Sequence, residues 1–195
     1  MAFTSYDFLL FYLTVFVLYW VVRERRWQNL ILLAASYVFY GWLQPWLTVL
    51  LGISTLADFF LARGMDIYPN RKRLLMWISL FINLGVLAFF KYFGFFSQSI
   101  IAALQDVGIQ ADSFLLSILL PAGLSFFTLK KLGYMIDVSR GTLKPPHTLV
   151  DFALYVSFFP QIIAGPIERP QKLLPQIEAP RIWKKIIFIG HGLCL

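Results

Sequence analysis

Charged residues are scarce in this sequence. Only 14% of its 195 residues are Asp, Glu, Lys or Arg, against roughly 25% in a typical soluble domain. Hydrophobic residues make up 59%, and residues 27–57 carry no charge at all. A soluble domain would interrupt such stretches with polar faces, and a disordered chain would be far less hydrophobic. The composition therefore excludes both classes and predicts an all-α, polytopic transmembrane protein.

Several chemical signatures are also missing. The single cysteine, Cys194, excludes an internal disulfide. The sequence has no Cys/His metal spacing, no Walker phosphate loop, no Gly-rich dinucleotide turn and no nucleophile elbow. The net charge of +7 does not indicate a nucleic-acid partner, because Lys and Arg form short clusters between apolar segments. The N-terminus has neither a basic n-region nor a cleavage site, so we expect its first apolar segment to be an anchor.

Seven apolar segments follow one another along the chain. They cover residues 8–22, 27–40, 46–61, 74–96, 114–129 and 149–167, and a last one starts near residue 186. The first four loops between them hold three, zero, four and zero Lys and Arg residues, at 23–26, 41–45, 62–73 and 97–113. The positive-inside rule then places the first and third loops in the cytoplasm and the N-terminus outside.

The segment 149–167 departs from this alternation, because positive charges flank it on both sides. A re-entrant or broken segment would satisfy those charges better than a full crossing. Pro160 and the Gly165–Pro166 pair are the residues that such a break requires. Irregular backbone at membrane depth must line protein or a wet cavity, so we expect a cavity open to the cytoplasm. The alternative is an ordinary span with a proline kink.

A second unusual segment is the helix expected over residues 121–140. Lys130, Tyr134, Asp137 and Gly141 fall on one face of it. Ionisable groups on an apolar helix are costly in a membrane and point toward a partner or a cavity. The alternative is that Lys130 and Lys131 mark the cytoplasmic membrane edge while Asp137 pairs with Arg140.

Combining the two segments gives a candidate site. Polar side chains beside Pro and Gly breaks predict a substrate cavity, lined by Ser125, Tyr134, Asp137, Gln161 and Arg169. The two histidines do not suit a catalytic base. His147 follows two prolines in a basic loop, and His191 lies in the last apolar segment. A lone histidine there is more often a packed, hydrogen-bonded residue.

Five motifs in order carry a resemblance to a known family. They are residues 5–11 (SYDFLLF), 35–42 (ASYVFYGW), 83–85 with 90–92 (NLG and FKY), 120–128 with 134–141 (LPAGLSFFT and YMIDVSRG), and 158–167 (FFPQIIAGPI) with Arg169. Together they resemble the membrane-bound O-acyltransferase (MBOAT) family, and most of all its alginate O-acetyltransferase branch.

The resemblance implies a function for the full-length protein. It would transfer acetyl groups from an acyl donor such as acetyl-CoA, used as substrate, to an exported polysaccharide such as alginate. It would sit among lipids in the cell inner membrane and work with a separate extracytoplasmic acetyltransferase. No metal or bound cofactor is expected. A small multi-span transporter or channel subunit, or a purely structural membrane subunit, is the alternative; a transporter would show two pseudo-symmetric halves.

One feature of the family is missing from this sequence. In the family the catalytic histidine lies further along, in a Trp- and Arg-rich stretch. We therefore expect residues 1–195 to be a single transmembrane domain, the N-terminal part of a longer enzyme, with no catalytic residue of its own.

Overall fold

The computed structural model describes residues 6–43, 45–106, 123–145, 148–164 and 168–180. Every regular element in these ranges is helical, and no strand occurs among them. The elements are α1 (Tyr6–Val21), α2 (Arg25–Leu43), α3 (Pro45–Ile67), η1 (Pro69–Arg71), α4 (Lys72–Asp106), α5 (Leu124–Ser139), α6 (Leu149–Ser157), α7 (Phe159–Ala164) and α8 (Pro170–Glu178). Two stretches, Pro45–Ile67 and Pro69–Tyr92, are long and apolar enough to cross a membrane. The predicted class, an all-α membrane protein, is confirmed.

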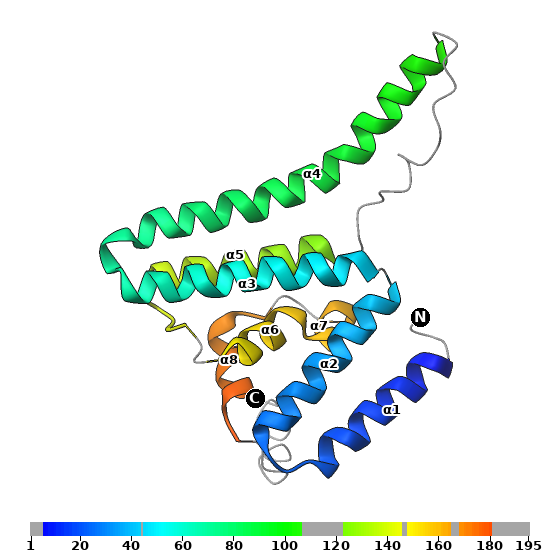
Figure 1. Ribbon diagram of the computed structural model, residues 1–195. Helices are drawn as coiled ribbons and strands as arrows, with labels where there is room; N and C mark the ends of the chain where they lie inside the picture. The colour runs from blue at the N-terminus through cyan, green and yellow to red at the C-terminus, as the bar shows by residue number, and fades with distance from the viewer. Residues whose placement is uncertain (1–5, 44, 107–122, 146–147, 165–167, 181–195) are drawn as a thin grey trace, which may run out of the picture.

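Helix α3 is the centre of the described bundle. It packs against α2, α4, α5 and α6. Figure 1 shows α5 lying alongside α3, with the long helix α4 running past both. Helix α1 contacts α2 and buries only Val15 of its own residues. Helices α6 and α8 pack on each other and fill the space beside α2.

The bundle buries several charged and polar side chains within its apolar core and exposes many large apolar side chains. Asp58 and Lys131 are 1% and 0% exposed, whereas Phe81 on α4 is 82% exposed. Large apolar side chains also cover the outer surface of α1, such as Leu10 at 69% exposed. In water this arrangement would be unfavourable, but hydrocarbon solvates the apolar side chains and drives the polar ones inward. The distribution is that of a protein surrounded by lipid.

Two of the predicted loops are shorter than the sequence indicated. Helix α3 continues to Ile67, so Arg63 lies on a helix and not in a loop. Helix α4 extends to Asp106 and includes the first ten residues of the predicted loop 97–113. The stretch 97–106 contains neither Pro nor Gly, so nothing in it ends the helix. The predicted segment 114–129 is described only from residue 123, and the last segment lies outside the described residues.

The segment 149–167 is broken, as the sequence predicted. Helix α6 ends at Ser157, and Phe158 leaves the helical region at φ −54° and ψ 101°. Helix α7 restarts at Phe159, with Pro160 in its first turn, where a missing N–H costs nothing. At about 1.5 Å per residue, these helices of 9 and 6 residues are both far shorter than a membrane of about 30 Å. The re-entrant path itself stays a prediction.

Candidate functional site

Helix α5 carries two consecutive lysines inside the bundle. Lys130 is 1% exposed and Lys131 is 0% exposed. Neither side chain reaches the surface, so both are directed into the bundle; the suggestion that they mark the membrane edge stays a prediction. Neighbouring residues on an α-helix point about 100° apart, so the two lysines meet different parts of the bundle.

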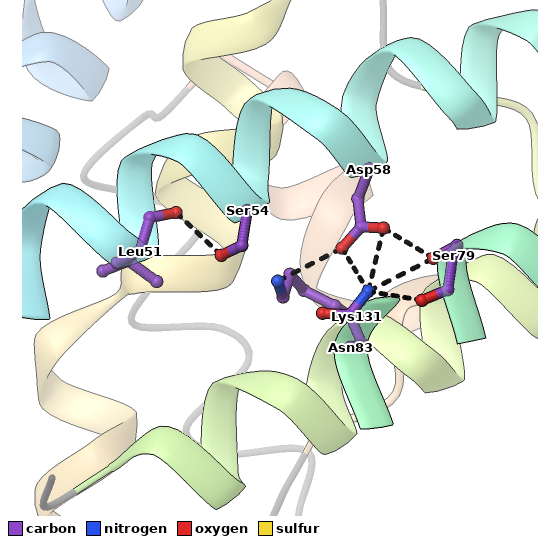
Figure 2. A network of polar contacts seen from close by, with 6 residues as sticks. All are labelled: Leu51, Ser54, Asp58, Ser79, Asn83 and Lys131. Carbon is purple, nitrogen blue, oxygen red and sulfur yellow. Dashed lines mark hydrogen bonds and ion pairs between the residues drawn. The ribbon is translucent and has the colours of Figure 1, made fainter. Parts of the chain in front are cut away.

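Lys131 points into a network between three helices (Figure 2). Its ammonium lies 3.2 Å from a carboxylate oxygen of Asp58 on α3. From α4, the hydroxyl of Ser79 donates to the same carboxylate at 2.5 Å, and the amide of Asn83 donates to both of its oxygens at 2.9 and 3.0 Å. All four side chains are buried. The positive charge of Lys131 is thus balanced by the Asp58 carboxylate, which also accepts hydrogen bonds from Ser79 and Asn83.

Lys130 points toward α6 and α7 instead. Its ammonium donates to Oε1 of Gln161 at 2.5 Å and lies 4.7 Å from the ring centroid of Tyr155. The Tyr155 hydroxyl donates back to the carbonyl oxygen of Lys130 at 3.3 Å. Gln161 in turn donates through Nε2 to the carboxylate of Glu168 at 3.1 Å. Gln161 therefore holds Lys130 and Glu168 at either end of one amide group.

These groups border a recess of about 310 Å³. Its polar lining consists of Lys130, Asp137, Arg140, Tyr155, Glu168, Arg169 and Gln171. Three basic side chains and two carboxylates thus line the recess, so that basic groups outnumber acidic ones. It is open on one side, between the C-terminal half of α5 and the start of α8. We name it the basic recess.

The charges of the two lysines are balanced differently. Within the described part of the chain, the contact between Lys131 and Asp58 is the one ion pair below 4 Å. No described carboxylate therefore pairs directly with Lys130, whose contacts are a neutral amide oxygen and aromatic rings. A buried ammonium of this kind favours an anionic ligand in the space beside it.

The structure brings together three of the five predicted site residues. Asp137 and Arg169 line the basic recess, and Gln161 reaches it through its bonds to Lys130 and Glu168. Tyr134 is fully buried 4.6 Å from the ring of Phe152 and does not line the recess. Ser125 is exposed in the first turn of α5, away from the recess.

The predicted alternative for Asp137 is wrong. No ion pair joins it to Arg140 among the described side chains, although both line the recess. The face of α5 that meets the recess is Lys130, Gly133, Asp137 and Arg140, so Tyr134 lies just beside it. This small rotation follows from the packing of Tyr134 against α6, which sequence spacing does not contain.

Sequence reasoning missed the residues that bind these helices together. Asp58 had no assigned role, although it is the one charge between Arg26 and Arg63 in the sequence. An isolated carboxylate on an apolar helix signals a buried partner. Asn29 on α2 was also missed; it donates to the carboxylate of Asp151 at 2.7 Å and to the carbonyl of Ile177 at 3.1 Å.

A larger cavity of about 520 Å³ lies between α1 and the helices α6–α8. It is lined by apolar and aromatic side chains with one amide, Gln176, and by no charged residue. It offers no acid, base or counter-ion. The described residues also contain no group of three His, Cys, Asp or Glu side chains that could hold a metal. His147 and His191 lie outside the described residues.

Comparison with known proteins gives the chain's relatives. It is 36% identical over 184 residues to the probable alginate O-acetylase AlgI of Pseudomonas syringae pv. tomato, and 37% identical over 181 residues to that of Pseudomonas aeruginosa. Each match covers 91% of this chain. The chain is a relative of the alginate O-acetylases. The resemblance that the five motifs predicted is thereby confirmed.

A second kind of relative is more distant. A peptidoglycan O-acetyltransferase of Helicobacter pylori is 30% identical over 86% of this chain. The chain spans about a third of the length of these relatives, 35% for each of the two alginate O-acetylases. No family model and no solved structure matches the chain.

Proposed function

We propose that this chain is part of a membrane-bound O-acyltransferase that acetylates an exported polysaccharide such as alginate. The names of the relatives support this proposal, since one kind is called a probable alginate O-acetylase and the other a peptidoglycan O-acetyltransferase. The same names do not favour a transporter or channel subunit. The described helices likewise give one broken segment and no second, matching one.

The structural observation that carries the proposal is the burial of Lys130 beside the basic recess. Lys130 is a buried basic group without a paired carboxylate among the described residues, and it borders a recess in which basic side chains outnumber acidic ones. We assign the anionic part of the acyl donor, such as the phosphates of acetyl-CoA, to the basic recess. Arg140 and Arg169 are placed at its rim to attract that charge, and Gln161 orients Lys130.

The roles of these residues are binding and orientation. Acetyl transfer to a hydroxyl also needs a base within hydrogen-bond reach of the acceptor. We place that base outside residues 1–195, in the histidine motif of the family. The chain described here then supplies the wall against which the donor is held.

The proposal includes a location and a partner. The protein would lie in the cell inner membrane with its N-terminus outside, and the acetyl group would pass to an extracytoplasmic acetyltransferase that modifies the polymer. With this orientation the basic stretches at residues 23–26 and 63–73 face the cytoplasm. Cysteines placed at Glu24 and Asn70, with Cys194 replaced, should react with a membrane-impermeant thiol reagent only after the cells are opened. Reaction in intact cells would contradict the orientation.

The function is tested with variants of the basic recess in the intact protein. Lys130→Met should raise the donor KM by at least about tenfold, because a hydrogen bond to a charged group contributes roughly 1.5–3 kcal/mol. Asp137→Asn and Gln161→Ala should lower polymer acetylation while the protein still inserts into the membrane. Lys144→Met removes an exposed cation outside the recess and serves as the control. Unchanged acetylation in all three recess variants would show that these residues are only structural.

A further inference from the structure

The two buried lysines of α5 have different partners but share one helix. Lys131 is tied to Asp58 on α3, and Asp58 is tied to α4 through Ser79 and Asn83. Lys130, the next residue back, is directed at Gln161 on α7. The rotation of α5 that satisfies one lysine therefore fixes the direction of the other.

We propose that Asp58 and Lys131 form a clamp that sets the rotation of α5 and thereby directs Lys130 into the basic recess. Asp58 would then be a positioning residue: it acts on the recess through α5 and touches no substrate. The effect on the donor rests on the function proposed above, whereas the effect on α5 does not.

The geometry favours a clamp for three reasons. The Lys131 ammonium and the Asp58 carboxylate are both buried, so water cannot replace either partner if the helix turns. Asp58 cannot move to follow Lys131, because two donors from α4 hold its carboxylate. The recess side of α5 adds little to this restraint, since Gly133 offers no side chain to interlock with a neighbour.

The first experiment measures the rotation of α5 without any substrate. In the intact protein with Cys194 replaced, single cysteines are placed at Gly133, which lines the recess, and at Met135, which is buried in the core. A cysteine fits at Gly133, because no heavy atom lies within 4 Å of the added Cβ. A small thiol reagent should label position 133 much faster than position 135.

The clamp is then removed by Asp58→Leu together with Lys131→Met. Replacing both partners by apolar residues leaves no unpaired buried charge, so this variant should still fold. We expect the labelling preference for position 133 over 135 to fall severalfold. Asp66→Asn, an exposed carboxylate on the same helix α3, is the matched control and should leave the preference unchanged. A folded clamp variant that keeps the full preference would overturn the proposal.

The second experiment asks whether the clamp acts through Lys130. Asp58→Asn should raise the donor KM about tenfold in the native background but have no further effect once Lys130→Met is present. Equal effects in both backgrounds would show that Asp58 acts independently of Lys130, and would overturn the coupling. If the labelling preference falls but Lys130→Met leaves the donor KM unchanged, the clamp stands and the donor assignment fails.

Discussion

Replacing Lys131 by Met should be among the most destabilising single changes in the described bundle. Its ammonium lies 3.2 Å from Asp58, with side-chain exposures of 1% and 2%. At an effective dielectric constant of about 20, two charges at this distance attract each other by about 5 kcal/mol. The substitution removes that attraction and leaves the carboxylate buried, which typically costs about 3–5 kcal/mol.

The double variant separates the pair from its surroundings. Asp58→Leu alone should cost a similar amount, because it leaves the Lys131 ammonium without its partner. Asp58→Leu with Lys131→Met removes both charges and should cost no more than about 2 kcal/mol, chiefly because Ser79 loses its acceptor. Asn83 keeps its bond to the carbonyl of Ser79 at 2.9 Å. The two single changes together should therefore exceed the double change by at least about 4 kcal/mol.

The measurement is the thermal unfolding midpoint of the intact protein, purified in detergent. At about 2–4 °C per kcal/mol for a chain of about this size, Lys131→Met should lower the midpoint by roughly 6–20 °C. Lys144→Met, which removes an exposed lysine, should change the free energy of unfolding by no more than about 0.5 kcal/mol and so leave the midpoint nearly unchanged. The reasoning is refuted if Lys131→Met costs less than about 1 kcal/mol, or if the double variant costs the sum of the two single ones.

Three further outcomes follow from other parts of the chain. Asn29→Ala should destabilise the protein by about 1–3 kcal/mol in the same unfolding assay, because it leaves the buried acceptor on Asp151 unpaired. Gly141→Ala should cost about 1–2 kcal/mol, since its φ of +74° suits only glycine, whereas Gly133→Ala in mid-helix should be neutral or stabilising by up to about 1 kcal/mol. Purified residues 1–195, offered donor and polysaccharide, should release no more product than buffer, because the base that we assign to acetyl transfer lies outside them; turnover above buffer would contradict this.

The positions of the first helices could be predicted from the sequence because polar clusters and Pro residues mark their ends. Helix α2 ends at Leu43 and α3 begins at Pro45, within the stretch where the turn signals lie. The end of α4 was predicted too early, because hydropathy falls near residue 97 while helix propensity does not. Hydropathy reports the surroundings of a helix, and a helix can continue beyond the apolar layer.

The surroundings of the basic recess were predicted in part for a similar reason. Asp137, Gln161 and Arg169 were identified because polar groups near a chain break are costly unless they line a cavity. Tyr134 and Ser125 share the same sequence motif, yet one packs in the core and the other is exposed. Their roles depend on the rotation of α5, and an error of one position on a helix changes direction by about 100°.

The rotation of α5 could not be predicted, because its determinants lie far away in the sequence. Lys130 and Lys131 are chemically identical neighbours, and no local pattern distinguishes which one meets a carboxylate. The distinction comes from Asp58, 73 residues earlier, and from Gln161, 31 residues later. A buried lysine in a membrane bundle must find a polar partner. These two distant residues, together with the packing of Tyr134 against α6, are therefore what the face of α5 toward the recess depends on. When two adjacent lysines occur in an apolar helix, a separate polar partner should therefore be sought for each of them.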